Sequence, residues 1–303
     1  MEWKKISKKM RNDWLLYLLI VPVVVWYLIF CYLPIAGGLS LSVRNFRFDE
    51  GIWTSPFVGL QHFQKMFADR DFMRATGNTI IISLGRIAFQ MPCAILAAIF
   101  LNEIRNAKLK RTFQTVITFP HFISWVVLAG ILSNIFGSSG IINQVLTMLG
   151  IENISPITTA ATFRPFIWLS NIWKEVGWDS IIYLAAISSV DTALYEAAEM
   201  DGCGKLKKMW HITLPGIRGT IGLLFIMGIG GLLSSGVDQI WLLRTPGNMT
   251  LADTLDVYVV RVGLQGGQFG YATAIGLIQG VVGLILVVIS NKICKKVTEV
   301  GLW

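Results

Sequence analysis

Five of the aromatic and polar residues between positions 168 and 179, in a largely apolar segment of this chain, share one face of a helix. With about 3.6 residues per helical turn, they fall within roughly a quarter to a third of the helix circumference. They are Trp168, Asn171, Glu175, Trp178 and Asp179. Such an arc suits a sugar, because apolar sugar faces stack on aromatic rings while hydroxyl groups need fixed donors and acceptors. We expect the arc to line a substrate path. The alternative is that Glu175 and its neighbour Lys174 only pair with other helices.

Two further apolar segments carry polar residues that need an explanation, since an ionisable group inside a membrane costs about 2.5–3.5 kcal/mol on insertion scales. Arg86 and Gln90 lie one turn apart on one face of the earlier segment. Arg86 could hydrogen-bond a substrate or pair with a carboxylate such as Glu175, and the structural pairing is favoured. Asp238, within the polar run 234–239, either lines an external vestibule or marks the point where a helix emerges into water.

Residues that could form a catalytic or metal site do not gather in the sequence. The three histidines, His62, His121 and His211, are far apart, and no Cys-x-x-Cys spacing occurs. The sequence also lacks the Gly-x-x-x-x-Gly-Lys-Ser/Thr loop that binds nucleotide phosphates. We therefore expect no enzyme activity, no metal and no cofactor in this chain, and no disulfide among its four scattered cysteines.

The elements that must position these side chains are membrane helices. Of the 303 residues, 54% are hydrophobic and only 15% are charged, which is too apolar for a soluble domain of this size. About 20 apolar residues cross a hydrocarbon core of roughly 30 Å, and on this basis we expect an all-α polytopic protein. The six expected spans are about 14–36, 78–101, 113–136, 165–188, 220–243 and 270–291. The first is too long for the apolar part of a cleaved signal peptide, which has roughly 7–15 residues.

The distribution of basic residues predicts the orientation of the chain. The net charge is +8, and lysines and arginines cluster before the first span, in alternate connections and after the last span, which is the positive-inside pattern. This distribution argues against a nucleic-acid partner and predicts a plasma-membrane protein with cytosolic tails at 1–13 and 292–303. Residues 14–77 would form the first span and an external loop, and residues 78–291 a transport core. Short external helices are expected at 62–67 and 141–149.

The connection between the fourth and fifth spans, residues 190–217, is expected to form two short helices. A helix-forming run, 193–200, reaches an Asp-Gly break at Asp201-Gly202. A second amphipathic run, 205–212, follows, and Pro215 is expected to stop it. Two short helices joined by a tight turn form a rigid protrusion on the cytosolic surface, which we call the knob. Such a shape suits docking better than it suits linking.

The spacing within the knob resembles the EAA motif of binding-protein-dependent ABC transporter permeases of bacteria. The matching residues are Glu196, Ala197, Ala198, Asp201, Gly202, Leu214 and Pro215. Cys203, Trp210 and Gly219 depart mildly from the usual pattern and leave the angle of the second helix open. The strings 173–178, 255–258 and 261–264 resemble the carbohydrate-uptake, maltose-type permeases, and among them the subgroup serving polysaccharide-derived oligosaccharides.

This resemblance implies a type I ABC importer permease in which the knob is the coupling helix, which sits in a cleft of a dimeric cytosolic ATPase. Glu196 would contact that ATPase, and the partner would bind ATP and Mg. An extracellular solute-binding protein would deliver the oligosaccharide, and a second permease, usually a different chain, would complete the path. Two alternatives remain. An ion-gradient-driven secondary transporter would leave the EAA loop unexplained, and a non-transporting membrane scaffold would not need the polar arc.

Overall fold

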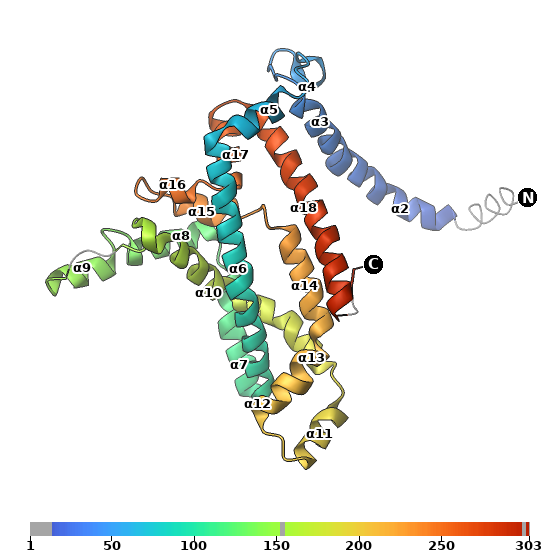
Figure 1. Cartoon of the computed structure of the whole chain (residues 1–303), viewed down its shortest axis with the longest axis vertical. Coiled ribbons are helices and arrows are strands. Elements are labelled where there is room, and N and C mark those ends of the chain that lie inside the picture. The colour runs from blue at the N-terminus through green and yellow to red at the C-terminus, as the bar shows by residue number, and fades with distance from the viewer. Residues whose placement is uncertain (1–13, 152–154, 299–300, 303) are drawn as a thin grey trace, which may run out of the picture. The chain divides into compact units, whose positions relative to one another are not determined.

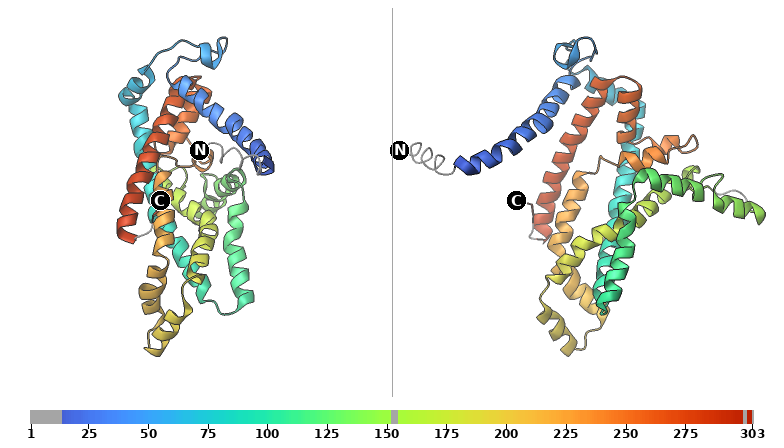
Figure 2. Two further views of the ribbon diagram at one scale, coloured as in Figure 1. Left: turned by 90° about the vertical axis from the view of Figure 1, so that its right-hand side faces the viewer. Right: turned by 180° about the vertical axis from the view of Figure 1, so that it is seen from behind.

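The computed structural model describes residues 14–151, 155–298 and 301–302 (Figures 1 and 2). Within these residues the regular elements are helices, and one isolated antiparallel bridge joins Arg44 to Phe57. The predicted all-α class is confirmed. The predicted tail 1–13 and part of the predicted C-terminal tail lie outside the described residues. The chain divides into two compact units, one of residues up to 68 with 259–278 and the other of 69–258 with residues from 279 onward.

The first unit begins with one long apolar helical run. It consists of α2 (Trp14–Tyr27), the π-turn η1 (Leu28–Tyr32) and α3 (Leu33–Ser42). Pro34 is tolerated because it lies in the first turn of α3, where its missing N–H leaves no gap. The unit also contains α4 (Gly51–Thr54), α5 (Gln61–Ala68), η4 (Arg261–Gln265) and the start of α18 (Phe269–Thr298). The helix predicted at 62–67 is thus present as α5, and its external position stays a prediction.

The second unit is built around two long helices, α6 (Arg70–Glu103) and α10 (Ala160–Ser188), which pack along one another (Figure 1). Glycines permit α10 to pack closely on α6 and on the helix at 107–118. A Cβ on Gly85 would lie 2.2 Å from the Trp168 ring, and a Cβ on Gly177 would lie 2.0 Å from the Ile117 carbonyl oxygen. The adjoining elements are α7 (Ala107–Thr118), η2 (Phe119–Phe122), α8 (Trp125–Phe136), α9 (Ile141–Met148), α14 (Arg218–Gly230), α15 (Val237–Leu242), α16 (Met249–Ala252) and α17 (Leu255–Val260).

Four helical runs among the described residues are long and apolar enough to cross a membrane. They are Trp14–Ser42, Arg70–Glu103, Trp125–Met148 and Phe269–Lys296. Two bent helix pairs, one at the end of α10 and one at the start of α14, would raise the number to six. The chain is an integral membrane protein, and the six-span count remains a prediction.

The third expected span, 113–136, is not a single helix. The α-helix α7 ends at Thr118, a 3-10 turn follows, and Ile123 is extended. Ser124 then caps α8 by accepting a hydrogen bond from the Val127 N–H at 3.3 Å. Pro120 cannot donate a backbone hydrogen bond to the preceding turn, so the α-helix is interrupted at this point. The sequence prediction of one continuous span was wrong because it counted apolar residues and ignored this local chemistry.

The fifth expected span, 220–243, is also broken. Helix α14 ends at Gly230, residues 231–236 form turns and coil, and α15 starts at Val237. Gly236 has a φ of 74°, a left-handed conformation that glycine adopts without a steric penalty. The helix of the second expected span, by contrast, is longer than predicted. It starts at Arg70 rather than 78, because Asp69 caps the helix by accepting from the Asp71 N–H at 2.8 Å.

Candidate functional site

The first arm of the knob is α11 (Thr192–Met200), and a Schellman motif ends it. The Cys203 N–H donates to the Ala198 carbonyl at 2.8 Å, and the Gly202 N–H donates to the Glu199 carbonyl at 3.0 Å. This pattern requires a left-handed residue, and Gly202 has a φ of 72°. The tight turn that the sequence predicts at Asp201-Gly202 is thus present, and glycine adopts its left-handed conformation without a steric penalty.

The second arm of the knob is longer than predicted. It runs through α12 (Lys205–Lys208), the π-turn η3 (Met209–Thr213) and α13 (Leu214–Gly216). Pro215 does not end the arm, because it lies in the first turn of α13, where a proline needs no hydrogen-bond partner. The chain bends by 62° only after Gly216, at the junction with α14. Gly216 packs tightly there, since a Cβ on it would lie 2.8 Å from Val190.

Two side-chain contacts hold the arms of the knob together. The Tyr195 hydroxyl lies 3.0 Å from Thr213 Oγ1, and Lys208 Nζ lies 2.8 Å from Glu199 Oε1. The hydrogen bond from Lys208, together with the positive charge of that side chain, lowers the pKa of Glu199. Lys205 reaches the end of α6, with its Nζ 2.7 Å from Glu103 Oε2. The knob is therefore a preformed surface.

The exposed residues of the knob combine acidic side chains with large apolar ones. Glu196 is exposed, whereas Ala198 is buried. Met200 is 89% exposed and Trp210 is 64% exposed, and Leu206 is exposed as well. Exposed side chains of this size are typical of a surface that binds another protein.

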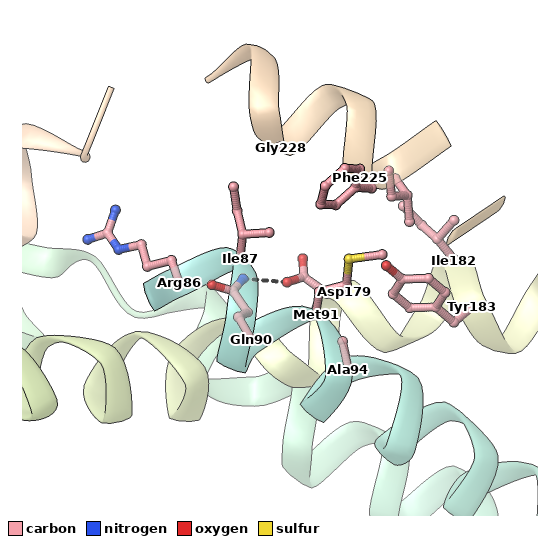
Figure 3. Close-up of a pocket in the computed structure, with 11 residues that line it drawn as sticks. Arg86, Ile87, Gln90, Met91, Ala94, Asp179, Ile182, Tyr183, Phe225 and Gly228 are labelled. Atoms are coloured by element: carbon pink, nitrogen blue, oxygen red, sulfur yellow. Dashed lines mark hydrogen bonds between the residues drawn. The ribbon is translucent and has the colours of Figure 1, made fainter. Parts of the chain in front are cut away.

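In the membrane-spanning helices, three of the predicted path residues form one hydrogen-bonded chain. Asn171 Nδ2 on α10 donates to Gln90 Oε1 on α6, and Gln90 Nε2 donates to Asp179 Oδ2. Figure 3 shows Gln90 and Asp179 pointing toward one another, while the Arg86 guanidinium points away from them. They border a cavity of about 250 Å³. Its lining includes Arg86, Gln90, Asp179, Tyr183, Phe225 and Gly228.

A second cluster joins α10 to the break before α8. Glu175 Oε2 lies 2.6 Å from His121 Nδ1, and Glu175 Oε1 lies 3.0 Å from Lys174 Nζ. Lys174 is only 5% exposed and also donates to the His121 carbonyl at 2.7 Å. The Trp178 ring stacks on the His121 ring, with centroids 4.3 Å apart and planes 5° apart. Sequence reasoning missed His121, and its place directly after Pro120 was the available signal.

The other predicted path residues have different surroundings. Arg86 does not form an ion pair with Glu175, because its guanidinium donates instead to the Ser235 carbonyl and to Gln239 Oε1. Arg86 therefore makes structural contacts, as favoured by the sequence analysis, but with Ser235 and Gln239 rather than with Glu175. Trp168 packs against Gly85 and donates to the Ile82 carbonyl at 3.0 Å. Asp238 is exposed in the first turn of α15.

The described residues contain no group of three or more His, Cys, Asp or Glu side chains arranged to hold a metal ion. Cys31, Cys93, Cys203 and Cys294 are free thiols. What the geometry does offer is an exposed pair of helical arms after the end of α10 and a set of polar groups in the middle of that helix.

Comparison with known proteins gives consistent matches. Residues 90–298 match the family model for the binding-protein-dependent transport system inner membrane component. Protein LplB of Bacillus subtilis is 42% identical over 97% of this chain and 92% of its own length. The polygalacturonan/rhamnogalacturonan transport system permease protein YteP of the same organism is 41% identical over 99% of this chain and 94% of its own length. A chain in the crystal structure of a bacterial alginate ABC transporter, in complex with a periplasmic protein that holds an alginate pentasaccharide, is similar as well. It superimposes with a TM-score of 0.88 at 36% identity, covering 97% of this chain and 99% of that chain.

Proposed function

The chain belongs to the family of binding-protein-dependent transport system inner membrane components, and we propose that it is the permease subunit of an ATP-driven oligosaccharide importer. Movement of a cytosolic ATPase would reach the membrane helices through the knob. The observation that carries this proposal is the knob itself, a preformed pair of helical arms whose first arm ends in the left-handed Gly202. Similarity to the alginate transporter supports it along nearly the whole chain.

In this proposal the coupling residues are those of the EAA motif, and each has a distinct part. Glu196 is exposed and would contact a basic group of the ATPase. The Ala198 carbonyl and the left-handed Gly202 form the turn that ends the first arm. Leu214 and Pro215 lie in the last turn before the 62° bend, so that a push on the knob would be passed to α14. ATP and Mg would be bound by the dimeric partner ATPase, and this chain would carry no catalysis.

The substrate path would follow the polar face shared by α6 and α10. Trp178 offers an indole ring that is 43% exposed, and its other face is supported by His121. Asp179 and Gln90 offer carboxylate and amide groups that line a cavity, and Asn171 donates to Gln90. Aromatic faces and fixed polar groups are what a sugar requires. A second permease chain would supply the opposite wall, and an extracellular binding protein would deliver the substrate.

The names of the relatives suggest where to look for the substrate. YteP is named for polygalacturonan and rhamnogalacturonan, and the related transporter of known structure carries alginate, an acidic polysaccharide. We propose that this chain also imports oligosaccharides released from a polysaccharide, with uronate-containing ones as the first class to test. Family membership gives no support to an ion-gradient-driven transporter or to a non-transporting scaffold.

The test is a panel of oligosaccharides presented to the purified complex with its binding protein. Oligogalacturonates, alginate oligosaccharides and neutral malto-oligosaccharides of equal length would be compared by stimulation of ATP hydrolysis. We expect stimulation by at least one acidic oligosaccharide. Stimulation by neutral sugars alone would contradict the substrate class, and a complex that no oligosaccharide stimulates would contradict oligosaccharide import.

A further inference from the structure

Asp256, in the first turn of α17, has no part in the knob or in the candidate path. Its Oδ2 accepts hydrogen bonds from the Ser235 N–H at 2.8 Å, the Gly236 N–H at 3.2 Å and Ser234 Oγ at 3.3 Å. Its Oδ1 accepts from Gln279 Nε2 on α18 at 3.2 Å. One carboxylate thus receives four donors, three of them from the break between α14 and α15.

The break needs such partners because non-helical backbone at membrane depth must be satisfied within the protein. Gln279 also donates to the Leu233 carbonyl at 2.7 Å, and Arg86 donates to the Ser235 carbonyl. Gly236 fits beside Arg86 because it has no side chain, since a Cβ there would lie 3.2 Å from Arg86 Nη1. Side chains from three other helices therefore hold residues 231–236 in one defined conformation.

The half of the span beyond the break is fixed to its neighbours by polar contacts. Gln239 on α15 is 1% exposed. Its Nε2 donates to the Ile167 carbonyl and to Ser170 Oγ on α10, both at 2.9 Å. Its Oε1 accepts from Arg86 on α6. These hydrogen bonds connect α15 to the two longest helices of its unit, so α15 cannot move without breaking buried hydrogen bonds.

The half before the break is different, because α14 contacts its neighbours mainly through apolar and glycine surfaces. A Cβ on Gly283 of α18 would lie 2.9 Å from the Gly230 carbonyl oxygen, and one on Gly228 would lie 3.7 Å from Ile87. The polar side chains of α14, Arg218 and Thr220, are confined to its knob end. Apolar helix surfaces permit the small sliding movements seen in shear motions. At that same end α14 continues directly from the second arm of the knob.

We propose that Asp256 is a positioning residue that fixes the outer half of the broken fifth span, so that α14 turns about residues 231–236 when the knob moves. Helix α15 then stays in place on α6 and α10 while α14 carries the movement to the cavity beside Gly228 and Phe225. The inference rests on the proposed function, since that function assigns movement to the knob. It adds the location of the pivot and the residue that holds it.

The experiment measures distances between spin labels in the complete complex, after replacement of the four native cysteines. One label stands at Leu169 on α10, and the second stands either at Met227 on α14 or at Leu242 on α15. All three side chains are exposed, at 65%, 61% and 37% respectively. We expect ATP to shift the Leu169–Met227 distance and to leave the Leu169–Leu242 distance unchanged. Equal shifts in both pairs would overturn the proposal.

The variant Asp256→Ala provides the second part of the test. It removes the acceptor for four donors, and we expect the Leu169–Leu242 distribution to broaden and the substrate-stimulated ATPase rate to fall about tenfold relative to the basal rate. Asp256→Asn keeps one acceptor oxygen and should give an intermediate result. The control is Asp49→Asn, which changes an exposed carboxylate elsewhere and should match the wild type. Wild-type distributions in Asp256→Ala would contradict the role of Asp256.

Two safeguards keep the outcomes separate. If Asp256→Ala fails to assemble, the wild-type label pairs and Asp256→Asn still decide the question. The failure of the proposed function looks different, because a complex that hydrolyses ATP but responds to no oligosaccharide contradicts the substrate assignment and leaves the label distances readable. If α14 and α15 move together, the proposed pivot is contradicted but the proposed function is not.

Discussion

Nδ1 of His121 lies 2.6 Å from Oε2 of Glu175, and this contact ties the break between α7 and α8 to the middle of α10. The same carboxylate receives the buried ammonium group of Lys174 at 3.0 Å. Trp178 belongs to the same cluster but contributes only a ring that stacks on the imidazole. The sequence analysis placed Glu175 and Trp178 together on one substrate path. In the structure Glu175 pairs with His121 and Lys174, whereas Trp178 keeps one ring face available for a ligand.

This separation predicts different outcomes for Trp178→Ala and Glu175→Gln. The first removes a half-exposed ring and unpairs no charge, so we expect substrate-stimulated ATP hydrolysis to fall several-fold while basal hydrolysis is retained. The second leaves the 5%-exposed Lys174 without a carboxylate, which typically costs about 3–5 kcal/mol. We therefore expect Glu175→Gln to reduce the yield of assembled complex. Both variants are checked by measuring basal and substrate-stimulated ATP hydrolysis on complexes of equal purity. If Trp178→Ala loses the same fraction of both rates, Trp178 does not belong to the substrate path.

Gly202 and Gly204 form a matched pair for testing the knob. Neither position has an atom within 4 Å of an added Cβ, but Gly202 has a φ of 72° and Gly204 has a φ of −69°. An alanine at 202 is strained by about 1–2 kcal/mol, whereas one at 204 is not. We expect Gly202→Ala to lower uptake about tenfold at normal membrane levels, and Gly204→Ala to transport normally. Equal uptake by the two variants would show that the left-handed turn is not required.

Gly177 provides a test of how closely α10 packs on α7. A Cβ at this position would lie 2.0 Å from the Ile117 carbonyl oxygen, and backbone cannot move aside as a side chain can. We expect Gly177→Ala to destabilise the complex by about 1–3 kcal/mol, the usual cost of overpacking. Gly130→Ala on α8 is the control, because nothing lies within 4 Å there. Thermal unfolding of the purified complex measures both, and an unchanged melting temperature for Gly177→Ala would contradict the close packing.

The orientation of the chain is open to a direct labelling test. The positive-inside pattern predicts that both termini face the cytosol. In a background without the native cysteines, Lys296→Cys on the exposed face of α18 should resist a membrane-impermeant thiol reagent in intact cells and react after lysis. Lys5→Cys, outside the described residues, should behave the same way. Labelling of either end from outside would contradict the six-span topology and the cytosolic position of the knob.

The elements that the sequence predicted correctly depend on local signals. Long apolar runs predicted the membrane helices, and an Asp-Gly pair after a helix-forming run predicted the tight turn in which Gly202 is left-handed. Helices α5 and α9 were likewise expected from short amphipathic or apolar runs. In each case the residues that form the element are also its main determinants, so a window of the sequence contains the necessary information.

The features that the sequence did not predict depend on partners far along the chain. The break after α14 is closed by Asp256, Arg86 and Gln279, and no window of the sequence brings these residues together. His121 was set aside as an isolated histidine, yet folding brings it to Glu175, 54 positions away. Arg86 was paired with the wrong partner for the same reason. Hydropathy counts detect how many apolar residues follow one another, but they do not detect where a helix stops within the membrane.

The most direct test of coupling through the knob is the ATP hydrolysis of the complex reconstituted in lipid vesicles with its binding protein. The wild-type chain should co-purify with a cytosolic ATPase, and the loaded binding protein should stimulate hydrolysis. In Glu196→Lys, which reverses the exposed charge on α11, we expect the chain to insert normally but to lose the ATPase or its stimulation. A wild-type chain that purifies without an ATPase, or a Glu196→Lys complex with normal stimulation, would contradict coupling through the knob.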